Sequence, residues 1–151
     1  MQPDATKKER SGWRDEGLSR RHREWGRPLH MTDIDWLVIE HAAGTSRALI
    51  EYKHECSGID FATSCNAAAL RHVAGTNRQP LPLFLVRYWR DPWTFSVSPE
   101  NATARALVPA TKTMNEREYV ALLYSLRGLR LADQIAATLD TRIHFELGEV
   151  A

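Results

Sequence analysis

Two short apolar segments separated by a small polar loop constrain the fold of this chain most strongly. Residues 35–39 (Asp-Trp-Leu-Val-Ile) and residues 48–53 (Ala-Leu-Ile-Glu-Tyr-Lys) flank the loop 42–46, which contains Gly. Short apolar runs joined by such a loop are typical of an antiparallel hairpin. If the pairing is symmetric about the loop, Asp35 lies opposite Lys53 and diagonal to Glu51, at a Cβ separation of about 7–8 Å.

The charged residues of this hairpin predict a metal site. Side chains two apart on a strand share a face, so Glu51 and Lys53 point the same way, while Tyr52 and His54 point to the opposite face. Two carboxylates in a partly buried site repel each other and need a cation to stay ionised. Mg²⁺ prefers hard oxygen ligands and keeps positions for water and phosphate oxygens. With Lys53 beside such a metal, the pattern predicts hydrolysis of a phosphodiester bond.

At these residues the chain resembles the PD-(D/E)xK nuclease superfamily, whose pattern is an acid, a hairpin and then acid-x-lysine. The resemblance implies that Asp35, Glu51 and Lys53 are catalytic. It implies that Asp35, Glu51 and the backbone carbonyl of Tyr52 bind Mg²⁺, for which Mn²⁺ is expected to substitute. The family core is a helix, a three-stranded meander, a second helix and a further strand. The implied fold is therefore α/β, with a restriction-endonuclease-like core of a central mixed sheet flanked by helices, and extra C-terminal helices.

The neighbouring segments fit this order of elements. Residues 18–25 before Gly26 predict a basic helix, and residues 66–74 predict a helix capped by Thr63 or Ser64 and ended by Gly75. Residues 83–88 form an apolar run that predicts a buried strand.

We call Asp35, Glu51 and Lys53 the triad. Three further positions each have two possible roles. Asp33 lies two residues before Asp35 and shares its face, so it is an alternative ligand or a supporting residue. Glu24 and Asn66 stand where some relatives carry an acid and a glutamine, and each also fits an ordinary solvated helix position. The competing interpretation of the triad is an exposed charged pair on an edge strand, where charges discourage aggregation.

Basic residues gather in the first part of the chain although the net charge is only +1. Contacts from Lys and Arg to phosphates provide most nonspecific affinity for nucleic acid. Two interpretations fit one cluster of these residues: it is a nucleic-acid-binding surface or a solvated helix face. The cluster consists of Arg20, Arg21, His22, Arg23 and Arg27. Residues 1–16 are polar enough to form a flexible basic arm, which leaves residues 17–151 as a single nuclease-like domain.

The second half of the chain predicts a hairpin followed by helices. Asp91-Pro92 marks a turn after which Trp93, Phe95 and Val97 share the core face, and Trp89 near this turn is a candidate for stacking on an unpaired base. Residues 114–126 predict a capped amphipathic helix and residues 129–139 a second, shorter helix. Alternation over residues 143–147 predicts a terminal strand.

Composition fits one globular domain: the 151 residues are 43% hydrophobic and 26% charged. No apolar run reaches the length of a membrane span and residues 1–10 lack a secretion signal, so no membrane partner and a cytoplasmic location are expected. The spacing of His54, Cys56, Cys65 and His72 matches no common zinc motif.

Together these features predict a metal-dependent endonuclease that hydrolyses DNA with structure selectivity or weak sequence selectivity. As in many small relatives, a homodimer with two active sites is expected. One alternative is a nuclease acting on RNA or single-stranded ends, and the other is a catalytically inactive nucleic-acid-binding or assembly protein that keeps the fold.

Overall fold

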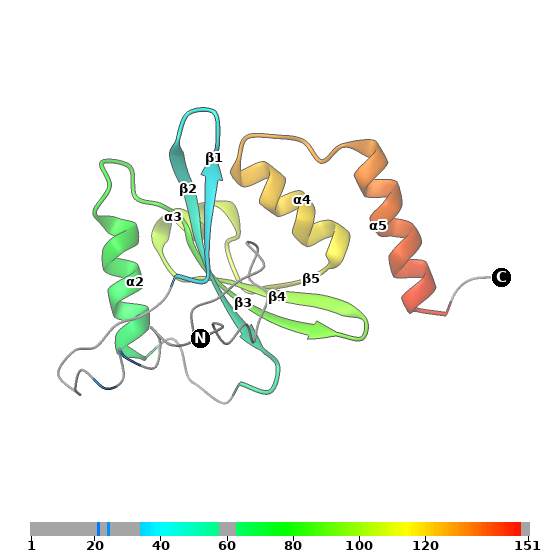
Figure 1. The fold of residues 1–151 in the computed structure, drawn as a ribbon, viewed down its shortest axis with the longest axis horizontal. Helices are drawn as coiled ribbons and strands as arrows, with labels where there is room; N and C mark the ends of the chain where they lie inside the picture. Colours follow the sequence, from blue (N-terminus) through cyan, green and yellow to red (C-terminus); the bar gives the residue numbers. More distant parts are fainter. Residues whose placement is uncertain (1–20, 22–23, 25–33, 58–62, 149–151) are drawn as a thin grey trace, which may run out of the picture. The chain divides into compact units, whose positions relative to one another are not determined.

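The computed structural model describes residues 21, 24, 34–57 and 63–148. Within these residues the chain is an α/β protein with a five-stranded sheet (Figure 1). In chain order the elements are β1 (Trp36–Glu40), β2 (Thr45–His54), α2 (Cys65–Gly75), β3 (Leu83–Arg90), β4 (Trp93–Pro99), α3 (Ala102–Leu107), β5 (Lys112–Asn115), α4 (Glu116–Leu126) and α5 (Asp133–Glu146).

The sheet is open and mixed, with strand order β1-β2-β3-β4-β5. Strands β2 and β3 are parallel, and the three other neighbouring pairs are antiparallel. A parallel pair needs a crossover connection, and α2 provides it. The predicted mixed sheet flanked by helices is therefore confirmed. In the described residues a two-stranded hairpin, and not a three-stranded meander, precedes α2.

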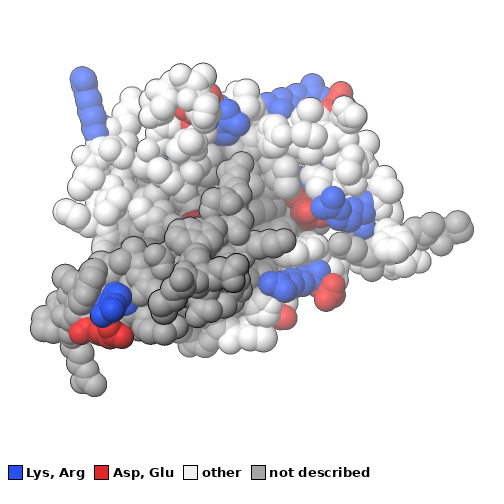
Figure 2. Space-filling view, in the orientation of Figure 1, with Lys and Arg blue, Asp and Glu red and all other residues white. Residues whose placement is uncertain are grey.

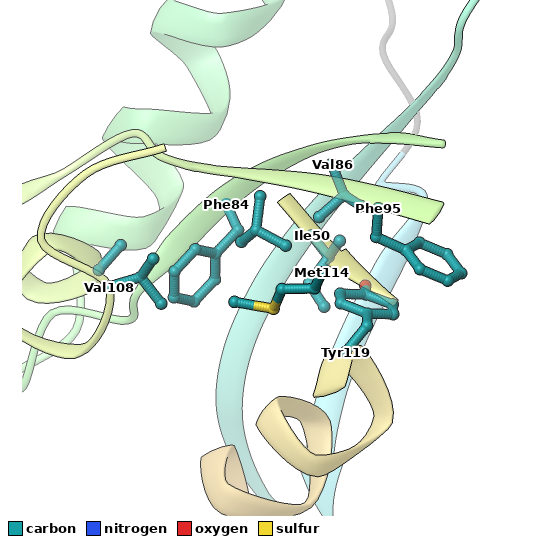
Figure 3. Packing of buried hydrophobic residues seen from close by; sticks show 9 residues of the cluster. Ile50, Phe84, Val86, Phe95, Val108, Met114 and Tyr119 are labelled. Atoms are coloured by element: carbon teal, nitrogen blue, oxygen red, sulfur yellow. The ribbon is translucent and has the colours of Figure 1, made fainter. Parts of the chain in front are cut away.

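Each face of the sheet carries its own hydrophobic core. On one face, α2 packs through Ala67, Leu70 and Ala74 against strand residues that include Leu49 and Leu83. On the other face, α3, α4 and β5 contribute to a larger core, shown in Figure 3 with its residues Ile50, Phe84, Val86, Phe95, Val97, Ala104, Val108, Met114 and Tyr119. We call these the α2 face and the α4 face. Because both faces are covered, the central strands are apolar on both sides.

Local sequence signals set the beginnings of helices α2 and α4. Ser64 accepts a hydrogen bond from the Ala67 amide at 3.1 Å and caps α2, as the sequence predicted. Asn115 and Glu118 form a reciprocal capping box at the start of α4, which confirms the predicted capped start.

The structure differs from the sequence prediction in the last third of the chain. Helix α3 and the edge strand β5 were not predicted. Helix α5 has 14 residues, against 11 in α4, so the expectation of a shorter second helix is wrong. The predicted terminal strand over 143–147 is also wrong, because α5 continues to Glu146. Three alternating apolar residues also fit a helix in which Ile143 and Leu147 lie one turn apart.

Helices long and apolar enough to cross a membrane are absent from the part of the chain that the structure describes.

Candidate active site

The hairpin of β1 and β2 places Asp35 beside Glu51. Trp36 pairs with Ile50, and continuing this register by one residue sets Asp35 opposite Glu51. The predicted symmetric pairing of Asp35 with Lys53 is therefore wrong. The turn occupies residues 41–44, with Gly44 at φ +61°, and a bulge between Val38 and Ile39 shifts the register. Residues directly opposite each other on an antiparallel pair lie closer than diagonal neighbours, so this register favours contact between the two carboxylates.

A side-chain to backbone hydrogen bond fixes the Asp35 carboxylate at the start of β1. Asp35 Oδ2 accepts a hydrogen bond from the Tyr52 amide at 2.9 Å. In an extended strand the N–H and C=O of one residue point to the same side, so the Tyr52 carbonyl points toward the same edge as Asp35. The geometry thus gathers one carboxylate and one carbonyl oxygen at this end of the hairpin.

Glu51 is the one charged residue that is buried among the described residues, with 7% of its surface exposed. Lys53 Nζ donates a hydrogen bond to Glu51 Oε1. Burial raises the pKa of the Glu51 carboxyl, the hydrogen bond from Lys53 opposes this shift, and the nearby negative charge of Asp35 raises the pKa further. Asp35 and Glu51 therefore interact, and Lys53 contacts Glu51 directly.

A second cation, which was not predicted, lies on the same face as Lys53. Arg87 of β3 pairs in register with Lys53 of β2, and residues paired across neighbouring strands share a face. The Arg87 guanidinium donates to the Ser57 carbonyl oxygen at 3.1 Å, which holds it beside the loop that follows β2. A break in the apolar alternation of β3, from Leu83 and Leu85 to Arg87, was the available signal.

The remaining predicted site residues fall into two groups. Asn66 is exposed in the first turn of α2, while Arg21 and Glu24 are exposed, helical and paired with each other at 3.6 Å. Arg21 and Glu24 belong to the N-terminal unit before Ile34 and are described on their own. The other predicted residues and segments lie outside the described residues: 1–16, Arg20, His22, Arg23, Arg27 and Asp33.

A different group of ligand atoms lies just past the triad. His54, Glu55 and Cys56 each offer one ligand atom within 4.8 Å of the others. His54 Nδ1 already accepts a hydrogen bond from the Cys56 amide at 3.3 Å. Of the four residues in the dismissed zinc pattern, this group contains His54 and Cys56. Its thiol and imidazole suit soft metals, whereas the oxygens around Asp35 suit hard cations such as Mg²⁺.

The site as a whole combines two interacting carboxylates, a backbone carbonyl and a lysine at the end of one hairpin. Such a donor set offers hard oxygen ligands together with a cation that can contact a phosphate oxygen. No protein-family model, curated protein or solved structure matches this chain.

Proposed function

We propose that this protein is a metal-dependent deoxyribonuclease of the PD-(D/E)xK type, built on a restriction-endonuclease-like core. The observation that carries the proposal is the convergence of Asp35 and the buried Glu51, with Lys53 Nζ bound to the Glu51 carboxylate. The parallel strand β3, which follows α2 and lies beside β2, also supports it, because a helix and a further strand are expected of that core after the acid-x-lysine strand. The two-stranded hairpin before α2 differs from the three-stranded meander of that core.

The residues present fit a hard divalent cation. The pKa of Glu51 is raised by burial and by the Asp35 charge, so the site without a cation disfavours two ionised carboxylates. A divalent cation removes this repulsion. The Asp35 and Glu51 carboxylates and the Tyr52 carbonyl would hold Mg²⁺ or Mn²⁺. When bound, such an ion lowers the pKa of a water ligand and stabilises negative charge on a phosphate.

Lys53 and Arg87 supply positive charge on the same face of the sheet. The Lys53 ammonium, already in contact with Glu51, is placed to donate to a phosphate oxygen or to orient the attacking water. Arg87 lies one strand away and adds a guanidinium that suits phosphate oxygens. We assign Lys53 to the chemical step and Arg87 to binding of the phosphate backbone.

The substrate class that fits this arrangement best is DNA cut by structure or with weak sequence selectivity. Figure 2 shows one face of the molecule. On its described part the basic side chains are interspersed with acidic ones and do not form one large patch. Extensive contacts to the phosphate backbone usually need such a patch, so local recognition near the site is favoured. A homodimer acting on both strands remains part of the proposal.

A plasmid-nicking assay with Mg²⁺ tests the proposal on the wild type, Glu51→Ala and Lys53→Ala. Lys112→Ala is the matched control, since Lys112 is an exposed lysine on β5. We expect cleavage by the wild type and the control, and its loss in both site variants with DNA binding retained. A wild type that cleaves neither DNA nor RNA in any form would contradict the proposal and favour an inactive binding protein. Cleavage of RNA alone would move the assignment to a ribonuclease.

A further inference from the structure

A pocket on the α4 face opens beside Asp35. Its volume is about 540 Å³, within the range of about 300–1,000 Å³ typical of small-molecule sites. Its lining comes from the start of β1 and from β2, β3 and β4: Asp35, Trp36, Tyr52, Tyr88, Arg90, Trp93 and Phe95. Five of these residues are aromatic, and one is the carboxylate assigned above to the metal. The pocket and the proposed active site therefore share a residue.

The aromatic rings of the pocket form a connected wall. The centroids of Trp36 and Tyr52 lie 6.3 Å apart in an edge arrangement, and those of Tyr52 and Tyr88 lie 6.1 Å apart in another. Tyr88 and Trp93 are stacked, with centroids 6.1 Å apart and an interplanar angle of 20°. Such contacts hold the rings in fixed orientations, so a planar ligand can stack on them with little reordering.

Trp36 is the part of this wall that solvent reaches most easily. With 52% of its surface exposed at the edge of the sheet, it has ring area that the protein itself does not cover. Arg90 is also exposed, and it lies two residues from Tyr88 on the same face of β3. The pocket thus combines an accessible indole with a guanidinium at its rim.

We propose that this pocket holds the base of an unpaired nucleotide next to the phosphate that is cut. Every base has an aromatic face and stacks on Trp or Tyr whatever its sequence, while Arg90 meets the adjacent phosphate. Strand alternation places Glu51 and Lys53 on the α2 face, whereas the pocket opens on the α4 face. Asp35, just before the edge strand β1, takes part in both, because it lines the pocket and its charge acts on Glu51. A DNA strand that passes over this edge of the sheet sets its phosphate at the metal and its base on the rings. This inference rests on the proposed function and deepens it, because it makes single-stranded or frayed DNA the preferred substrate.

The expected stacking residue differs from the one that the sequence suggested. Trp89 alternates with Tyr88 and Arg90 along β3, so it lies on the α2 face and does not line the pocket. Trp36, Tyr88 and Trp93 replace it. Trp36 is far from Tyr88 and Trp93 in the sequence, and the order of the strands brings it beside them.

Binding of short labelled oligonucleotides in EDTA, measured by fluorescence anisotropy, tests the base pocket without any cleavage. One oligonucleotide carries thymine throughout, and its partner has abasic sites at the same positions. We expect the wild type to prefer the base-bearing strand by about tenfold, since stacking on one aromatic residue has about that effect. Trp36→Ala should lose this preference, whereas Trp36→Phe should keep most of it.

Two further variants separate stacking from other effects. Phe145→Ala removes an aromatic residue that is 74% exposed on α5 and outside the pocket, so the preference should not change. Arg90→Ala should weaken both oligonucleotides equally and reduce the salt dependence of binding by about one phosphate contact. Thermal melting of each variant verifies that it is folded.

Equal affinity of the wild type for the two strands, or an unchanged preference in folded Trp36→Ala, would overturn the base pocket. A base preference that depends on Trp36 in a protein that cuts no nucleic acid would instead overturn the nuclease and leave the pocket standing. Cleavage without any base preference would overturn the pocket alone. The two proposals therefore fail by different results.

Discussion

Replacing Glu51 by Gln should stabilise the metal-free protein and at the same time remove its response to Mg²⁺. Glu51 is 7% exposed, and its pKa is raised by burial and by Asp35 despite the hydrogen bond from Lys53. Glutamine keeps the shape of the side chain and an oxygen that can accept from Lys53. It removes the buried negative charge and the repulsion with Asp35.

The size of the effect follows from three opposing terms. A hydrogen bond to a charged group contributes about 1.5–3 kcal/mol, and glutamine retains a neutral one of about 0.5–1.5 kcal/mol. Burying a carboxylate costs several kcal/mol. The raised pKa of Glu51 indicates that this cost is larger than the hydrogen-bond energy that the substitution loses. We expect a net gain on the order of 1 kcal/mol, which for a domain of about this size raises the melting temperature by about 2–4 °C.

Mg²⁺ should reverse this order of stability. At a concentration one hundred times its dissociation constant, a ligand that binds only the folded state adds about 2.7 kcal/mol. The wild type should then melt about 5–11 °C higher, while Glu51→Gln should not respond. Thermal unfolding with and without Mg²⁺, followed by circular dichroism, measures both shifts.

The difference in stability between metal-free wild type and Glu51→Gln should depend on pH. The pKa of Glu51 is raised above its ordinary value of 4.5. The stability that protonation of this side chain contributes is therefore fully present below pH 4.5 and is lost as the pH rises through the raised pKa. The advantage of Glu51→Gln should therefore appear only above pH 4.5. Below that pH the two proteins should have similar stability.

Glu40→Gln is the matched control because it makes the same change on the neighbouring strand. The pKa of Glu40 is lowered, first by the hydrogen bond from the Ala42 amide and then by Arg127. This variant should lose stability and keep its response to Mg²⁺. The reasoning is refuted if Glu51→Gln melts below the wild type without metal, or if Mg²⁺ stabilises both proteins equally.

Two other substitutions follow from the same contacts. Lys53→Ala should reduce the cleavage rate by about 10²–10³-fold, since a positioned charge donor is lost, while calorimetry still detects Mg²⁺ binding; lost metal binding would make Lys53 structural. Tyr119→Phe removes the hydroxyl hydrogen bond to Tyr52 and should cost about 1–3 kcal/mol in unfolding experiments, whereas Tyr124→Phe on the same helix should have little effect. Equal stability of the two tyrosine variants would show that the buried hydroxyl pair contributes nothing.

Local signals in the sequence predicted much of the fold. The Ser64 cap, the capping box of Asn115 and Glu118, and the turn at Asp91-Pro92 each act within a few residues, and each element they predict is present. Helix α3, with six residues, and the edge strand β5, with four residues, were not predicted. Elements this short carry too few residues to display a periodicity, and pairing with β4 defines β5.

The sequence predicted which residues of the candidate site share a face, and it did not predict how the strands pair around them. Glu51 and Lys53 share a face because side chains alternate along a strand, and this alternation can be read directly from their spacing in the sequence. The pairing of Asp35 with Glu51 depends on the bulge between Val38 and Ile39, which no residue pattern announced. Arg87 and the aromatic pocket depend on which strands lie side by side, and a parallel neighbour such as β3 is set by packing across the whole domain.

A crystal structure soaked in Mn²⁺ tests the central claim most directly. We predict an anomalous density peak between the Asp35 and Glu51 carboxylates, adjoining the Tyr52 carbonyl, and its absence in Glu51→Gln crystals. A saturating soak that leaves this position empty, or that places the peak only at His54, Glu55 and Cys56, would contradict the assignment.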